Sequence, residues 1–239
     1  MSDESENLIE DVFVKQLGAK YPFVKAKNCN TKYGITGFPT FVVLDADGDV
    51  VQTGMPSEAR LEELLAAVVA MPATPAEPRF DALRQLWRKA DFGKLAEFLD
   101  RALAQPATDA SLRDVYTAHK AALDQGIAAQ QQRVASLAAG PDYAVADDKL
   151  ERIEHAWRGL PPAEAAKKER ARIAADPALK KELAAGRALL KLVAGFDAGK
   201  PAQRKKLIAE LERFQKANDG TFAGKQAAER LAALSKTGG

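Results

Sequence analysis

Three prolines within eight residues divide this chain into two parts of different character. They lie in the segment 72–79 and are Pro72, Pro75 and Pro78. Each proline removes a backbone donor and biases the residue before it toward an extended conformation. Neither a helix nor the centre of a sheet tolerates that spacing, so we expect a linker here. The sequence therefore predicts one domain over residues 1–71 and another over residues 80–239.

The second part has the residue spacing of helices and contains no run typical of a strand. Helix-breaking residues interrupt the pattern near Asp91, Pro106, Gly140-Pro141, Pro161-Pro162, Pro177 and Lys200-Pro201. The longest stretch runs from Asp109 to Ala138, and its apolar residues recur every three or four positions, as in a helix that packs against others. Because short connections favour antiparallel neighbours, we expect an all-α domain of antiparallel helix pairs.

Two windows of this second part, residues 150–173 and 208–231, align with each other without gaps. In each window a helical pattern is followed by a short turn with glycine or proline and by a second helical pattern. This organisation resembles the helix pairs of tetratricopeptide-like (TPR-like) repeats, although the aromatic and small residues of the strict repeat are only partly present. A TPR-like array and an unrelated helical bundle both remain open.

The first part mixes strand and helix patterns. A helical stretch over residues 8–20 is followed by short apolar runs at 23–26, 41–44 and 50–51, which predict three strands. The pair Asp47-Gly48 lies between the last two runs. Because this pair tolerates the positive φ of a tight turn, we expect those two strands to be antiparallel neighbours.

A further helix is predicted directly after Ser57. The Ser57 hydroxyl can cap its N-terminus, and Glu58 suits its first turn. Apolar residues at helical spacing would form its packing face: Leu61, Leu64, Leu65, Val68 and Val69. The helix should end before the prolines.

The segment from Lys32 to Gly48, KYGITGFPTFVVLDADG, is the most specific motif in the chain. It resembles the thioredoxin superfamily, in which a YGI-x-G-x-PT segment precedes an antiparallel hairpin and a final helix. The resemblance implies a cis peptide bond between Phe38 and Pro39 and a peptide-binding loop formed by Thr36, Gly37, Phe38, Pro39 and Thr40. From the residues alone, Pro39 serves equally well as a rigid turn that binds nothing.

Thioredoxin chemistry needs a low-pKa cysteine at a helix N-terminus and a second cysteine three positions later. This chain has one cysteine, Cys29. Aligning LIEDVF, which begins at Leu8, with the tail of the C-x-x-C-x-x-L-x-x-E-V-F pattern of exported relatives would put Ser2 and Ser5 in the cysteine places. We expect no catalytic residue in the chain as written. Cys29 is expected to be a quiet thiol; a reactive, redox-sensing thiol is the alternative and would need exposure and nearby positive charge.

The resemblance also implies that the α/β domain is incomplete, with three recognisable strands. In the thioredoxin fold two strands precede the cysteine motif, and one of them lies between two of the strands expected here, so its loss leaves backbone groups unpaired. The strands could close into a smaller sheet, a second copy of the chain could donate a strand and form an oligomer, or the natural protein could begin upstream of Met1. We favour the third outcome, because it also accounts for the missing cysteine pair.

The charge balance does not indicate a nucleic-acid or membrane surface. Thirty-five basic and thirty-three acidic residues leave a formal charge of +2, and the densest basic run, residues 167–172, is predicted to be a solvated helix face. The chain has no apolar run of membrane-spanning length, and its acidic start is unlike a signal peptide. As written, the chain is expected in the cytoplasm; an extracytoplasmic location follows if the natural start lies upstream.

No metal or cofactor is expected. His119 and His155 lie on different predicted helices without a second ligand at metal-binding spacing, and no phosphate loop or nucleophile motif is present. The expected function is a thioredoxin-like protein that binds a protein or peptide partner without redox chemistry. The alternatives are an oxidoreductase whose catalytic half is missing from this reading frame and a structural helical scaffold.

Overall fold

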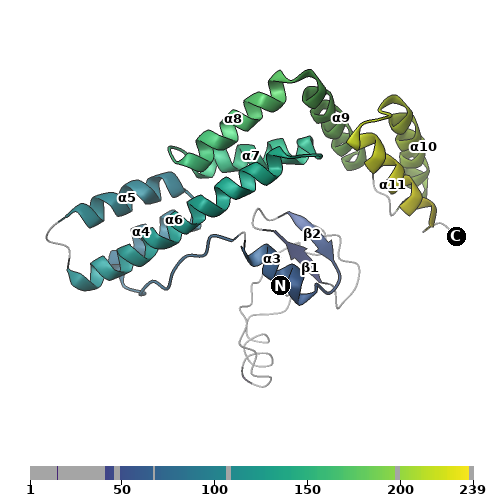
Figure 1. Ribbon diagram of the computed structural model, residues 1–239. Helices are drawn as coiled ribbons and strands as arrows, with labels where there is room; N and C mark the ends of the chain where they lie inside the picture. Colours follow the sequence, from purple (N-terminus) through teal and green to yellow (C-terminus); the bar gives the residue numbers. More distant parts are fainter. Residues whose placement is uncertain are drawn as a thin grey trace. The chain divides into compact units, whose positions relative to one another are not determined.

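The computed structural model describes residue 15 and residues 41–45, 49–66, 68–105, 109–196 and 200–236. The chain forms two compact units, residues 1–66 and 67–239. Within the described residues, the elements shown in Figure 1 are β1 (Val42–Leu44), β2 (Val50–Thr53), α3 (Glu58–Ala66), the 3-10 helix η2 (Pro78–Phe80), α4 (Asp81–Arg88), α5 (Phe92–Ala104), α6 (Ala110–Ala138), α7 (Tyr143–Ala156), α8 (Pro161–Ala175), α9 (Pro177–Ala194), α10 (Pro201–Ala217) and α11 (Phe222–Lys236).

The described part of the first unit is a β-hairpin followed by a helix. β1 and β2 pair antiparallel, with Val42 opposite Thr53 and an irregularity after Val43. At the end of the hairpin the Asp45 N–H donates to the Asp49 carbonyl at 2.9 Å, and the Asp49 N–H donates to the Asp45 carboxylate at 3.0 Å. The antiparallel pair predicted from the sequence is confirmed.

Helix α3 begins where the sequence predicts. The Arg60 N–H donates to the Ser57 hydroxyl at 3.3 Å, which caps the first turn. The helix ends at Ala66, so the prediction that Val68 and Val69 extend its apolar face is wrong. Val69 lies in a stretch without helix and packs instead against the core of the second unit.

Three predictions for the first unit lie outside the described residues. They are the helix over residues 8–20, of which only Lys15 is described, the strand over 23–26 and the Asp47-Gly48 turn. The incomplete three-stranded sheet and the three ways of satisfying its edge therefore stay predictions.

The second unit is helical, and four of its described helices begin at an aspartate cap. α6 runs from Ala110 to Ala138, the stretch predicted from its apolar spacing, and the Ser111 N–H donates to the Asp109 carboxylate at 2.7 Å. Aspartates cap three other helices in the same way: Asp91 for α5, Asp142 for α7 and Asp176 for α9. Helices α8, α9 and α10 start at prolines, which suit the first turn because its N–H groups have no partner within the helix.

The two windows aligned in the sequence have the same local structure. Residues 150–173 cover the end of α7, a turn and most of α8, and residues 208–231 cover the end of α10, a turn and most of α11. The two helices of each window contact each other, and the matched residues Ile153 and Leu211 are both buried.

Two clusters of buried side chains stabilise the second unit. The larger is formed by η2, α4 to α8 and the first half of α9, and includes Phe80, Leu95, Leu123, Leu150, Ile173 and Leu183. The smaller is formed by the second half of α9 with α10 and α11, and includes Leu189, Leu207 and Leu211. Helix α9 therefore contributes side chains to both clusters.

A buried carboxylate joins α7 to α8 and α9. Asp147, whose side chain is 8% exposed, accepts from Arg170 of α8 at 3.1 Å and from Arg187 of α9 at 2.5 Å. Removing one arginine would leave a buried charge with less compensation. Arg170 also donates to Glu154 at 3.0 Å, so the basic run over residues 167–172 is not wholly the solvated face that the sequence predicts.

The segment 68–77, which contains most of the predicted linker, forms neither helix nor strand and packs on the helices that follow it. A Cβ added to Gly126 of α6 would come within 2.7 Å of a Val69 methyl group. The Arg84 guanidinium of α4 donates to three consecutive carbonyls, those of Pro75, Ala76 and Glu77. These contacts hold the segment against the helices that follow it.

His119 of α6 holds the middle of this segment. Its ring is 0% exposed and lies 5.7 Å from the ring of Trp87. Its Nε2 is 2.9 Å from the Thr74 hydroxyl, which is also 2.9 Å from the Pro72 carbonyl. Because a carbonyl only accepts, the single hydroxyl proton goes to Pro72 and His119 Nε2 donates to Thr74. His119 Nδ1 is then a buried acceptor with no partner among the described residues.

We expect the second unit to lose stability as the pH falls below about 6.5. Burial lowers the pKa of His119 from its ordinary value, because the charged ring would lose its hydration. The unfolded chain therefore binds a proton more readily than the folded chain, so the stabilisation is complete above the ordinary pKa and is lost as the pH falls through it. One proton gives at most about 1.4 kcal/mol per pH unit.

Urea unfolding across this pH range measures the effect. His119→Gln is expected to have a lower unfolding free energy at neutral pH and a weaker dependence below it. His155→Gln, which changes an exposed histidine, serves as the matched control and should keep the wild-type dependence. The assignment to His119 would be contradicted if His155→Gln removed the pH dependence of the unfolding free energy and His119→Gln left it unchanged.

Candidate functional site

The peptide-binding loop predicted from the sequence lies outside the residues that the structure describes. This applies to Thr36, Gly37, Phe38, Pro39 and Thr40, and also to Cys29. Their proposed roles stay predictions. The hairpin that should follow the loop is present, since β1 begins at Val42.

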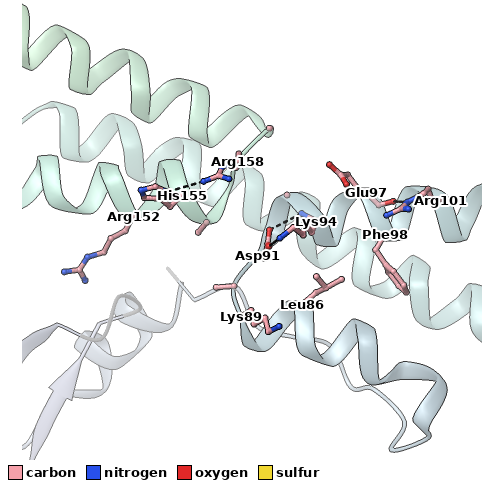
Figure 2. A pocket seen from close by; sticks show the side chains of 14 residues that line it. Leu86, Lys89, Asp91, Lys94, Glu97, Phe98, Arg101, Arg152, His155 and Arg158 are labelled. Atoms are coloured by element: carbon pink, nitrogen blue, oxygen red, sulfur yellow. Dashed lines mark hydrogen bonds and ion pairs between the residues drawn. The ribbon is translucent and has the colours of Figure 1, made fainter.

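The second unit carries a groove of about 860 Å³ between the α4–α5 turn and the last turns of α7 (Figure 2). Its apolar lining includes Leu86 and Phe98. Five cationic side chains line the groove, and all are exposed: Lys89, Lys94, Arg101, Arg152 and Arg158. Two acidic side chains accompany them, Asp91 and Glu97. The volume is within the ~300–1,000 Å³ typical of ligand sites.

The groove exists because the first turn of α5 packs directly on the turn that follows α7. The ring of Phe92 stacks on that of Trp157, with centroids 4.2 Å apart and planes 21° apart. A Cβ built on Gly93 would overlap the carbonyl oxygen of Arg158. Only glycine therefore allows the two backbones to approach this closely.

The turn between α4 and α5 forms the near end of the groove. The Ala90 N–H donates to the Trp87 carbonyl at 3.0 Å, and the Asp91 N–H donates to the Leu86 carbonyl at 3.2 Å. This pair of bonds closes a helix in the Schellman arrangement, whose residue with positive φ is usually glycine. Here it is Ala90, with φ of 50°, so the turn that presents Lys89 carries backbone strain.

Two of the five cations have carboxylate partners in the structure. Lys94 pairs with Asp91 at 2.8 Å, and Arg152 pairs with Asp148 at 2.7 Å. The hydrogen bond from the Lys94 side chain is the largest of the effects that lower the pKa of Asp91. Asp91 therefore stays ionised and offsets part of the positive charge at this end of the groove.

The other three cations form no ion pair with a carboxylate within the part of the chain that the structure describes, although the charge of Arg158 also contributes to the lowered pKa of Asp91. Arg101 donates from Nε to the Glu97 carbonyl at 3.2 Å, and an Nη of Arg158 lies 3.5 Å from His155 Nδ1. Lys89 is exposed on the α4–α5 turn. These groups keep donors available for an anion.

Sequence reasoning missed this groove because its cations are far apart in the chain. Lys89 and Arg158 come from opposite walls, and no basic run marks either of them. The one local signal is the triplet from Asp91 to Gly93, in which a capping residue, an aromatic residue and a glycine open a helix. This triplet indicates a close helix contact but not the charge around it.

No membrane span or metal site is found within the described ranges. No helix there is both long enough and apolar enough to cross a bilayer. No three His, Cys, Asp or Glu side chains of these residues gather where they could hold a metal ion.

The comparisons with known proteins concern the first part of the chain. Residues 3–69 match the family model described as a thioredoxin-like domain, so the thioredoxin-like resemblance of this part is confirmed. No curated protein and no solved structure gives a significant match. The groove lies beyond the matched residues, and the TPR-like resemblance of the second part stays a prediction.

Two neighbouring substitutions should change stability in opposite directions. Gly93→Ala places a methyl group against the Arg158 carbonyl and is expected to lower the unfolding free energy by about 1–3 kcal/mol. Ala90→Gly relieves the positive φ and is expected to raise it by about 1 kcal/mol. Urea unfolding of both variants tests the contact, and a neutral or stabilising Gly93→Ala would show that α5 does not meet the turn after α7 in this way.

Proposed function

We propose that this chain is a thioredoxin-like protein that binds a protein partner and does not exchange thiols for disulfides. The observation that carries the proposal is a single cysteine, Cys29, in a chain whose residues 3–69 match a thioredoxin-like domain. In dithiol exchange one thiolate attacks the substrate disulfide and a second thiol resolves the mixed disulfide. A lone cysteine has no second thiol in the chain for that step.

The loop at residues 36–40 is one binding surface in this proposal. The resemblance implies that Phe38, the residue before Pro39, pairs its backbone with a partner peptide. Main-chain pairing of this kind recognises extended segments with little dependence on their side chains. The position of the loop directly before the β1–β2 hairpin supports the assignment.

The helical unit is the second binding surface. In this proposal its helices are antiparallel pairs of a TPR-like array, and the matching helix–turn–helix windows support that assignment. Such arrays stack helix pairs and bind proteins along the surfaces that they expose. The groove between α5 and α7 is the described cavity of this unit that best suits a peptide.

The absence of redox chemistry is tested by the reduction of insulin in dithiothreitol. The wild-type chain and Cys29→Ser are expected to leave the rate at that of dithiothreitol alone, because neither chain has a resolving thiol. An acceleration by wild type that Cys29→Ser abolishes would contradict the proposal and favour an oxidoreductase.

Partner binding is tested by photo-crosslinking in the source cells. A photoreactive residue at position 89, in the groove, is expected to give discrete adducts with a partner protein. The matched control places it at position 180, where Lys180 is exposed on α9 outside the groove. Adduct patterns that do not differ between the two positions would count against a docking site in the groove.

A further inference from the structure

We infer that the groove between α5 and α7 binds an acidic segment of the partner, in which aspartate or glutamate residues alternate with apolar ones. This inference rests on the proposed function and names the chemistry of the partner. It is argued from the charge of the groove, the donors that it leaves available and its apolar lining.

The charge of the groove is concentrated. Five cationic and two acidic side chains line it, so this one cavity carries a larger positive surplus than the +2 of the whole chain. A cavity lined mainly by one sign of charge attracts the opposite sign and speeds its encounter. The groove would therefore attract the carboxylates of a partner.

Cations face the groove from both walls. Arg158 comes from the turn that follows α7, while Lys89 and Arg101 come from the α4 and α5 side (Figure 2). None of these three cations forms an ion pair with a carboxylate of the described residues. Because a guanidinium can bind a carboxylate through two parallel N–H bonds, the acidic residues, which lie on one face of an extended segment, can be bound by cations of either wall.

The groove also offers an apolar surface. Leu86 and Phe98 line it, and both are half-buried. Phe98 packs edge-on against Tyr116, with ring centroids 5.7 Å apart, so its ring is fixed from behind. In an extended segment successive side chains point in opposite directions, and a pattern of alternating acidic and apolar residues meets the cations and this surface at once.

Nucleic acid fits the groove less well than an acidic peptide. Asp91 and Glu97 lie among the cations and would repel a continuous phosphate backbone. Single-stranded nucleic acid usually stacks successive bases on several exposed aromatic rings, whereas Phe98 is the only Phe, Tyr or Trp among the described residues that line the groove.

The test measures the binding of short fluorescent peptides to the full chain. One peptide alternates glutamate and leucine, and two others of the same length carry glutamine or lysine in place of glutamate. The groove variant is Lys89→Glu with Arg158→Glu. The matched control is Lys180→Glu with Lys205→Glu, which changes the net charge equally at exposed positions outside the groove. Circular dichroism melts verify that both variants fold.

We expect the glutamate peptide to bind wild type and control saturably, more weakly as salt is raised, and to bind the groove variant about tenfold or more weakly. Equal binding of the glutamine peptide would overturn the inference, and so would equal losses in both variants. Tighter binding of a single-stranded oligonucleotide at the same groove would also overturn it. If the glutamate peptide does not bind while position 89 still gives groove-specific crosslinks, the proposed function stands and only the acidic character of the partner is rejected.

Discussion

The close approach of Gly93 to the carbonyl of Arg158 is the constraint on which the groove depends. With no side chain at Gly93, the backbone of α5 approaches the turn that follows α7, and the stacked rings of Phe92 and Trp157 close the contact on one side. Both walls are thereby fixed before any partner arrives. A preformed site of this kind avoids part of the ordering cost of binding, which matters most where the attraction is electrostatic and screened by salt.

Much of the helical unit could be predicted from the sequence because its signals are local. The start of α6 is marked by Asp109, whose carboxylate caps the helix, and its end lies close to Gly140-Pro141. The hairpin is equally local, since a turn pair flanked by apolar runs specifies antiparallel pairing within a few residues. In these cases the residues that form an element also mark its limits.

The features that sequence reasoning missed are tertiary. The prolines at 72–79 predict a linker, but nothing local reveals that Thr74 meets His119 forty-five residues later. Arg170 likewise belongs to a charged run, and only the fold brings buried Asp147 within reach. The groove follows the same rule, because the charge of a cavity is a sum over distant positions. Cavities and ion pairs are therefore hard to predict from local sequence patterns, whereas helices are not.

Helix α9 has a consequence for how the chain opens. Its first half belongs to the larger core through Leu183, and its second half belongs to the smaller core through Leu189, while Arg187 reaches back to Asp147. A fluctuation that releases α10 and α11 uncovers one side of α9, and the departure of α9 removes a partner from a buried charge in α7. The two cores are thus coupled through α9. Local unfolding at the C-terminal end removes a stabilising contact from α7, the helix that forms one wall of the groove.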